Sequence, residues 1–114
     1  MDRNEAATYA SWFRCLADPT RLQLLHVLAE TSGSLTIGQL VEAVGVGQST
    51  VSGHVQRLAA GGFVFVERAG TTTHVRANED CLTALPAAAD AIMARNRATT
   101  GRHVADGSRD PGAT

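Results

Sequence analysis

The chain has 114 residues, of which 44% are hydrophobic, and a formal net charge of −1. This length suits one domain with a modest core, and no run of about 20 apolar residues is present to cross a membrane. The first five residues lack the charged-then-apolar order of a signal peptide, so we expect a cytoplasmic protein whose two cysteines are thiols. A Gly-rich phosphate loop, a metalloprotease helix motif and a Cys-x-x-Cys pair are missing, which argues against an enzyme.

Two helices are predicted at the start of the chain. The first, over residues 4–17, has an apolar face at positions i, i+3, i+4 and i+7, formed by Tyr9, Trp12, Phe13 and Leu16. This face carries three of the five aromatic residues and suits either a core or a contact with a second subunit. Asp18 as N-cap and Pro19 at the first helical position predict a second helix that runs to about Glu30.

A helix-turn-helix is predicted over residues 35–58. The helix over residues 35–44 has one apolar face, and Gly45-Val46-Gly47 forms the turn. In the following helix, residues 47–58, the apolar stripe consists of Val51, Val55 and Leu58. The rest of that helix carries hydrogen-bonding side chains and no carboxylate: Gln48, Ser49, Ser52, Gln56 and Arg57, with His54 beside them. Such a surface favours a DNA-recognition helix over an ordinary surface helix, which more often carries Glu and Lys.

A β-hairpin is predicted to follow. Gly61-Gly62 ends the helix, residues 63–66 and 72–76 read as strands, and residues 68–71 turn between them. Helix, turn, helix and hairpin predict a winged helix-turn-helix, an α+β fold that is mainly α. Residues 47–76 contain three arginines and one glutamate, so the positive charge lies on the predicted DNA-binding part of the chain.

The last helical region is predicted in two pieces. Asn78 is a plausible cap, but Pro86 lies too far inside for one regular helix, so we expect a short turn at 79–84 and a main helix from Pro86 to about Arg95. The alanine-rich composition of this helix allows close helix–helix approach. Apolar residues become scarce after residue 96, which predicts a domain over 1–96 and a disordered tail over 97–114.

Three motifs carry a family resemblance: residues 16–25 (LADPTRLQLL), residues 48–54 (QSTVSGH) and residues 68–71 (RAGT). They resemble the start of the second helix, the recognition helix and the wing of ArsR/SmtB-family repressors, in the family's order and spacing over roughly residues 8–94. Many members have His where this chain has Gly53. The resemblance implies a transcriptional repressor that forms a homodimer through its first and last helices. The interface residues implied are Tyr9, Trp12, Phe13, Leu82, Leu85, Ala89, Ile92 and Met93.

The expected partner is double-stranded DNA. We expect base-edge contacts from Gln48, Ser49, Ser52 and Gln56. Positioning or phosphate contacts are expected from Thr50, His54 and Arg57, although helix packing is an open alternative for His54. Contacts from the wing are expected from Arg68, Thr71, Thr72 and Thr73. The two-fold symmetry of a dimer requires an inverted-repeat operator with half-sites about one helical turn apart. A winged helix that binds protein rather than DNA is the alternative of a different class.

The resemblance also implies an effector, commonly a metal ion. The family's third-helix site needs cysteines near Ile37, and none is present there. The family's last-helix site, started from Asp80, would place its other ligands on Leu82, Met93 and Asn96, which do not suit it. Both usual metal-site motifs are therefore absent.

Cys15, His26 and Cys81 remain as weak candidates for metal ligands. The cysteines could be inert buried thiols, or a thiol switch. They could also join His26, with Glu79, Asp80, Asp90 or His103, in a zinc or nickel site. Alternatively, a corepressor protein could supply the metal site.

Overall fold

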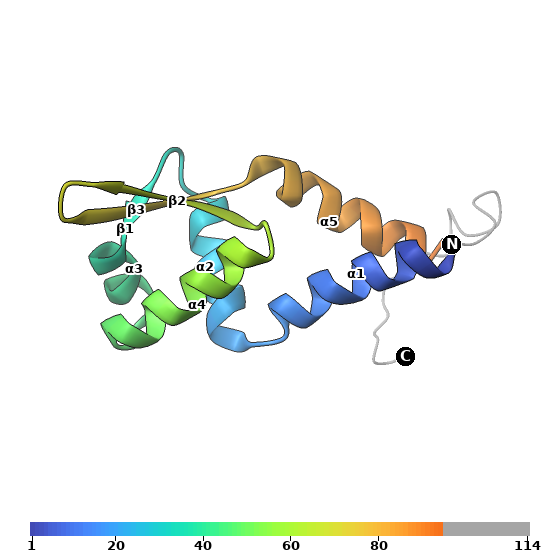
Figure 1. Ribbon diagram of the computed structural model, residues 1–114, viewed down its shortest axis with the longest axis horizontal. Coiled ribbons are helices and arrows are strands. Elements are labelled where there is room, and N and C mark those ends of the chain that lie inside the picture. Colours follow the sequence, from blue (N-terminus) through green and yellow to red (C-terminus); the bar gives the residue numbers. More distant parts are fainter. Residues whose placement is uncertain (95–114) are drawn as a thin grey trace, which may run out of the picture.

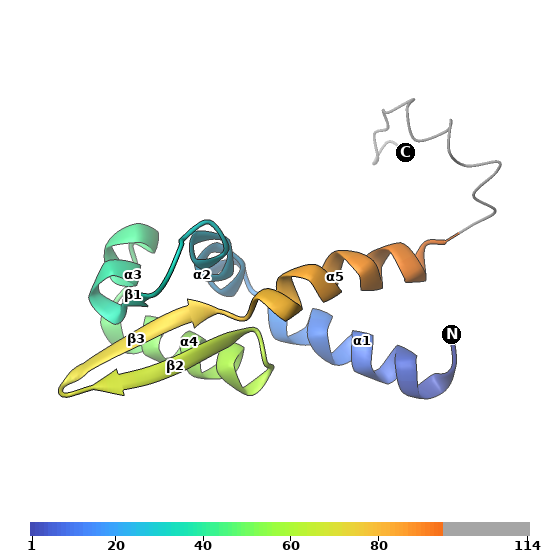
Figure 2. The ribbon, with the colours of Figure 1, turned by 90° about the horizontal axis from the view of Figure 1, so that it is seen from above.

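The computed structural model describes residues 1–94 (Figures 1 and 2). Its elements follow in the order α1 (Arg3–Leu16), α2 (Pro19–Ala29), β1 (Leu35–Thr36), α3 (Ile37–Val44), α4 (Gln48–Ala60), β2 (Val64–Ala69), β3 (Thr72–Ala77) and α5 (Glu79–Ile92). The predictions for the tail 97–114, for Asn96 and His103, and for a helix that ends near Arg95 lie outside the described residues. The α+β winged helix-turn-helix, mainly helical, is confirmed.

The core lies where α2, α3 and α4 meet the sheet. Its fully buried side chains come from each of these elements and include Leu24, Leu28, Leu40, Val51, Leu58, Phe63 and Val75. The predicted apolar stripe of α4 is buried, because Val51, Val55 and Leu58 are each no more than 2% exposed. One face of α4 is thus fixed in the core, and the opposite face is left at the surface.

Local capping sets the start and end of the helix-turn-helix segments. Asp18 accepts backbone hydrogen bonds from Thr20 (2.8 Å) and Arg21 (3.1 Å), as its predicted N-cap role requires. Thr36 and Gln39 form a reciprocal capping box at the start of α3. Gly45 ends α3 with φ 74°, a left-handed conformation that favours glycine. The turn between α3 and α4 therefore follows from residues 45–47 themselves.

The sheet contains a strand that sequence reasoning missed. Leu35 and Thr36, predicted as the first turn of a helix, form β1 and pair antiparallel with Val75 and His74 of β3. The strand order is β1-β3-β2. The capping box of Thr36 ends the extended segment, so the helix begins two residues later than predicted. This pairing ties the start of α3 to the wing.

The hairpin is longer than predicted. In β2, Arg68 pairs with Thr73, so Arg68 is a strand residue rather than a turn residue. The tip narrows to Gly70 and Thr71, where Gly70 has φ 67°. Both strands thus extend the wing away from the core.

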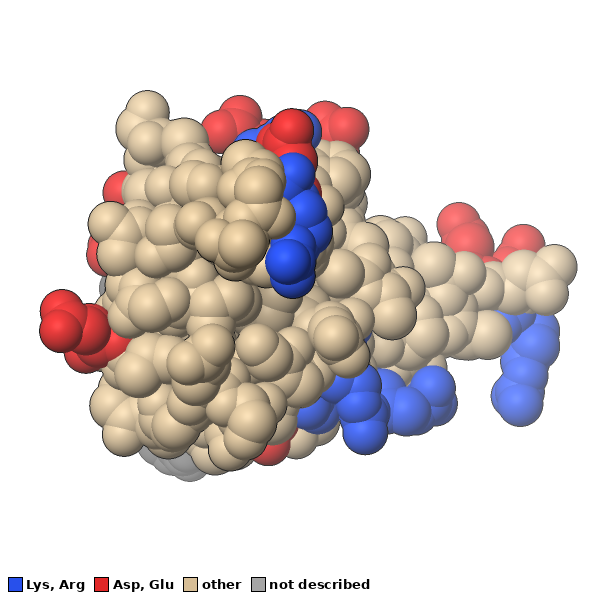
Figure 3. Space-filling view, turned by 60° about the vertical axis from the view of Figure 1, so that its left-hand side comes forward, with Lys and Arg blue, Asp and Glu red and all other residues tan. Residues whose placement is uncertain are grey.

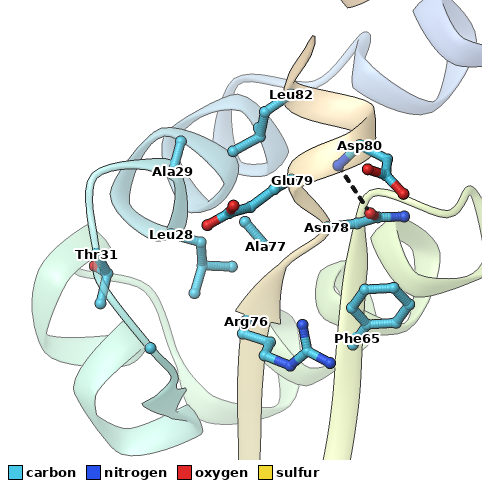
Figure 4. Close-up of a pocket in the computed structure, with 11 residues that line it drawn as sticks. Leu28, Ala29, Thr31, Phe65, Arg76, Ala77, Asn78, Glu79, Asp80 and Leu82 are labelled. Atoms are coloured by element: carbon cyan, nitrogen blue, oxygen red, sulfur yellow. Dashed lines mark hydrogen bonds between the residues drawn. The ribbon is translucent and has the colours of Figure 1, made fainter. Parts of the chain in front are cut away.

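The prediction of a broken last helix is wrong. Helix α5 is continuous from Glu79 to Ile92 with Pro86 inside it. Asn78 accepts a hydrogen bond from Asp80 N (3.1 Å) and donates one to Gly62 O (2.9 Å), which fixes the helix start (Figure 4). Pro86 removes one hydrogen bond of the helix. Pro86 is exposed, and the preceding side chains of Cys81, Leu82 and Leu85 pack against the core, so the helix continues through it.

Helices α1 and α5 both extend beyond the winged core on the same side of the molecule (Figures 1 and 2). Their outer parts expose large apolar side chains: Phe13 is 41% exposed, Ile92 43% and Met93 75%. None of the helices in residues 1–94 has the length and apolar character needed to span a membrane. The two extended helices therefore carry apolar surface that this single chain leaves uncovered.

Candidate nucleic-acid interface

The exposed face of α4 carries polar side chains without intramolecular partners. Gln48, Ser49, Thr50, Gln56 and Arg57 are exposed, and Ser52 is half-buried. Within residues 1–94, the side chains of Gln48, Ser49 and Gln56 make no hydrogen bond to the rest of the chain. Their donors and acceptors are therefore free for an external partner. Amide and hydroxyl groups of this kind match base edges and phosphate oxygens.

His54, one of the predicted DNA-binding residues with helix packing as its alternative, faces α2. Its Nδ1 lies 3.1 Å from Nη1 of Arg21, and its Nε2 lies 3.9 Å from Oδ1 of Asp18. The arginine can only donate, so Nδ1 accepts. His54 is 20% exposed at its side chain. Packing is thus the interpretation that the geometry supports, and His54 links the recognition helix to the first turn of α2.

The pKa of Asp18 is lowered at this junction. The main cause is the hydrogen bond from the backbone of Arg21, and a second one from Thr20 adds to it. The nearby ring of His54 and the guanidinium of Arg21 lower the pKa of the Asp18 carboxyl further, while partial desolvation opposes them. The cap of α2 and the position of α4 therefore depend on the same carboxylate. Sequence reasoning found the cap in the motif of residues 16–25 but not its contact with α4.

The wing lies beside the recognition helix. A hollow of about 370 Å³ separates them, and its wall includes Ser52 and Gln56 of α4, Arg68 of β2 and Thr73 of β3. Thr71 and Thr72 are exposed at the tip. The structure thus brings the predicted wing residues and half of the predicted base-contacting residues to one surface.

Positive charge is spread around this surface. On the side of the molecule viewed in Figure 3, the basic side chains form separate groups with a broad uncharged area between them.

One arginine, Arg76, lies over the ring of Phe65 at 4.5 Å from its centroid. The two line a hollow of about 420 Å³ behind the wing, together with Asn78, Glu79 and Asp80 (Figure 4).

The two cysteines, Cys15 in α1 and Cys81 in α5, both contact the backbone near the end of α4 but have different partners. The thiol of Cys15 donates to the carbonyl of Arg57 (3.5 Å), and that of Cys81 donates to the carbonyl of Gly62 (3.0 Å). Burial raises the pKa of both thiols; Arg21 and Arg57 oppose the rise at Cys15, whereas Asp80 adds to it at Cys81. Both thiols therefore favour the protonated form that these hydrogen bonds require.

The weak metal candidates do not gather into a site. His26 lies 3.6 Å from Glu30 on the outside of α2, away from the partners of Cys15 and Cys81. No group of three or more His, Cys, Asp or Glu side chains suited to a metal ion occurs in residues 1–94. The described part of one chain therefore does not provide the three or four donors that zinc needs.

The residues implied for a dimer interface lie on α1 and α5. Tyr9 and Trp12 pack against each other with ring centroids 5.4 Å apart. Trp12, Leu82 and Leu85 are half-buried against this chain's own core, and Ala89 is also half-buried. Phe13, Ile92 and Met93 are exposed. The implied set is thus divided between residues that support the core and residues that are free to meet a partner.

The chain is similar to known regulatory proteins. A model of the bacterial regulatory protein arsR family matches residues 18–65. A probable mercury resistance operon repressor of Streptomyces lividans is 43% identical over 55% of this chain and 49% of that protein, so the chain spans about half the length of this relative.

Two solved structures have similar folds over most of their length. The crystal structure of the AntR antimony-specific transcriptional repressor has a TM-score of 0.66 and 37% identity, and the match covers 80% of this chain and 82% of that one. A homodimeric winged helix-turn-helix DNA-binding domain from Mycobacterium bovis, a possible ArsR-family regulator, has a TM-score of 0.61 and 30% identity, with 83% and 92% covered. Taken with the family match, these similarities show that the chain belongs to the arsR family of bacterial regulatory proteins.

Proposed function

We propose that this chain is a transcriptional repressor that binds an inverted-repeat operator as a homodimer. The observation that carries the proposal is the face of α4, which has free amide and hydroxyl groups and no carboxylate, beside a wing with exposed threonines and an arginine. Such a face suits a major groove, and the wing suits the adjacent backbone. The protein then acts where the chromosome is, in the cytoplasm.

The side chains divide into two roles under this proposal. Gln48, Ser49, Ser52 and Gln56 read base edges. Thr50, Arg57 and the wing residues Arg68, Thr71, Thr72 and Thr73 contact the sugar–phosphate backbone. His54 acts indirectly, because its contacts with Arg21 and Asp18 fix the angle at which α4 enters the groove.

Dimerisation through α1 and α5 supplies the symmetry. The exposed Phe13, Ile92 and Met93 would be covered by the same helices of a second copy, and the related Mycobacterium bovis domain is a homodimer. A two-fold axis between the copies presents two α4 helices to one face of DNA, with half-sites about one helical turn apart.

Selection of duplexes from a random pool tests the proposal. We expect the full chain to enrich an inverted repeat, with its two halves spaced by about 10 base pairs between centres. Enrichment of a single unrepeated half-site would contradict the dimeric mode of binding. A pool that remains random at low salt, combined with no affinity for any duplex, would contradict DNA recognition by α4.

For the effector we propose a metal ion, nickel or zinc, sensed through a site that a second copy or a corepressor protein completes. The names of relatives support a response to metals or metalloids, since one is a probable mercury resistance repressor and another is antimony-specific. Addition of nickel or zinc to the reduced protein should change its operator affinity at least about tenfold if the dimer alone completes the site. An effect seen only with cell extract assigns the site to a corepressor, and no effect in either case contradicts a metal response.

The positions of the cysteines support a second candidate, a thiol-responsive repressor. Both thiols donate to carbonyls near the end of α4. Peroxide would oxidise each thiol to a sulfenic acid with release of water, and the larger S–OH groups would disturb both contacts at the end of this helix. Peroxide should then weaken operator binding in the wild type and not in a Cys15→Ala/Cys81→Ala variant. Equal loss in both proteins would contradict a thiol switch.

A further inference from the structure

A second hollow lies where the end of α1, the start of α2 and the end of α4 meet. It has a volume of about 280 Å³, and its wall includes Arg14 and Cys15 of α1, Arg21 of α2, and Arg57 and Gly61 of α4. None of its lining residues is acidic. The consecutive helices α1 and α2 and the more distant α4 thus place three arginines around one concave surface.

These arginines form no close ion pair, although the charge of Arg21 acts on the nearby carboxyl of Asp18. Residues 1–94 contain six arginines, and three of them line this hollow. Within that part of the chain, Arg14, Arg21 and Arg57 form no ion pair with a carboxylate within 4.0 Å. Like charges held near one another repel, and an anion in the hollow would relieve this repulsion.

The surrounding structure holds one of the three guanidinium groups in position. Nε of Arg21 donates to the carbonyl of Cys15 (2.6 Å), and its Nη1 donates to His54 (3.1 Å). These bonds use only part of the five N–H donors of an arginine, so further donors remain for a ligand. Arg14 and Arg57 are exposed and free to close on the same ligand. Several convergent guanidinium donors suit a tetrahedral oxyanion such as phosphate.

We propose that Arg14, Arg21 and Arg57 form a phosphate-binding site at the C-terminal end of the recognition helix. Arg57 lies on the same exposed face of α4 as Gly53 and Ser49, so the site continues the surface that faces DNA in the proposed function. A backbone phosphate of the operator is therefore the favoured source, and this part of the inference rests on the proposed function. Free inorganic phosphate offers the same chemistry without DNA.

The reactivity of Cys15 reports whether a ligand occupies the hollow, because Cys15 is part of its wall. Cys81 is not part of that wall and serves as the internal control. The rate of alkylation of each cysteine by iodoacetamide is followed by mass spectrometry in the reduced full-length protein. Inorganic phosphate and an operator duplex are each added at constant ionic strength, with chloride as the reference. We expect at least one of the two to slow alkylation of Cys15 about threefold or more, while the rate at Cys81 stays unchanged.

Matched variants show whether the arginines cause this protection. Arg14→Gln and Arg57→Gln should abolish it, whereas Arg3→Gln, with the same charge change at the far end of α1, should not. If DNA is the source, the first two variants also weaken operator binding about tenfold and lower the slope of log K against log salt by about one per subunit. Arg21→Gln is less informative, because it also removes the contacts with Cys15 and His54.

The possible outcomes distinguish operator DNA from free inorganic phosphate as the ligand. They also distinguish failure of the phosphate site from failure of the proposed function. Protection by the duplex alone assigns the site to DNA, and protection by phosphate alone assigns it to a free oxyanion. Equal alkylation of Cys15 with and without both ligands would overturn the site. If Gln48→Ala still impairs operator binding in that case, the proposed function stands and only this inference fails.

Discussion

At the scale of single residues, Gly61 is the glycine of the described chain where an added side chain would meet the closest neighbour, Cys15. A Cβ at position 61 would lie 2.8 Å from Sγ of Cys15, although the backbone there (φ −82°) would accept alanine. We predict that Gly61→Ala destabilises the protein by about 1–3 kcal/mol because of this overlap. Urea unfolding followed by circular dichroism measures the change.

Two further variants control for helix propensity and for the thiol. Gly53→Ala, in the same helix and with nothing within 4 Å of the added Cβ, should stabilise by about 1 kcal/mol. In a Cys15→Ala background, the cost of Gly61→Ala should fall close to zero. An equal cost in both backgrounds would show that the thiol is not the cause.

Single residues also show where prediction from sequence stops. The apolar stripe of α4 and the cap at Asp18 follow from spacing and side-chain chemistry alone, and both were predicted. The contact of His54 with Arg21 joins residues 33 positions apart, so no local pattern indicates it. The three arginines of the phosphate site come from three helices, and only the packed fold brings them together.

At the scale of elements, Asp18 couples the start of α2 to α4 in a way that depends on pH. Its pKa is lowered in the folded protein, so its charge contributes stability above the unfolded pKa of about 3.9, and this contribution is lost as the pH falls through the folded pKa. Asn caps a helix comparably well but carries no charge. We predict that wild type is more stable than Asp18→Asn at pH 7 and that the difference shrinks as the pH falls below the unfolded pKa of about 3.9.

Thermal unfolding of both proteins at several pH values measures this difference. Asp2→Asn is a suitable control, because Asp2 caps α1 in the same way but makes no contact with another helix. A difference between wild type and Asp18→Asn that stays constant from pH 7 to about pH 3 would contradict the role assigned to the charge.

Two elements departed from their predictions for physical reasons. β1 consists of two residues whose pairing partners lie 38 and 40 positions later, and such a short segment has no periodicity of its own. In α5, Pro86 predicted a break, but the helix continues because Asn78 caps it upstream and apolar side chains hold it against the core. Tertiary contacts thus decided the structure of both elements, against a strong local signal only in the case of Pro86.

At the scale of the whole molecule, the exposed apolar side chains of α1 and α5 indicate a surface that a second subunit covers. We predict that Phe13→Asp and Ile92→Asp weaken self-association at least about tenfold, since a buried charge at an interface costs more than 1.4 kcal/mol. Sedimentation equilibrium measures the association. Phe65→Asp, an exposed aromatic of the wing, should leave it unchanged.

Self-association that is equal in all four proteins would contradict an interface formed by α1 and α5.

The sequence pattern alone did not show whether the aromatic face of the first helix belongs to the core or contacts a second subunit. The structure divides it, because Trp12 supports the core while Phe13 is exposed. The winged core is thus largely predictable from local patterns. The self-association surface is not, because it depends on which side chains of α1 and α5 the fold leaves exposed.

The free polar face of α4 reads DNA sequence under the proposed function. Fluorescence anisotropy with a labelled duplex from upstream of the protein's own gene, and with a scrambled duplex of equal composition, tests it most directly for wild type and Gln48→Ala. We predict that wild type prefers the upstream duplex and that Gln48→Ala loses about 1–3 kcal/mol of affinity for it, with little change on the scrambled one. Equal affinity of wild type for both duplexes, or an equal loss on both in the variant, would contradict sequence reading by this helix.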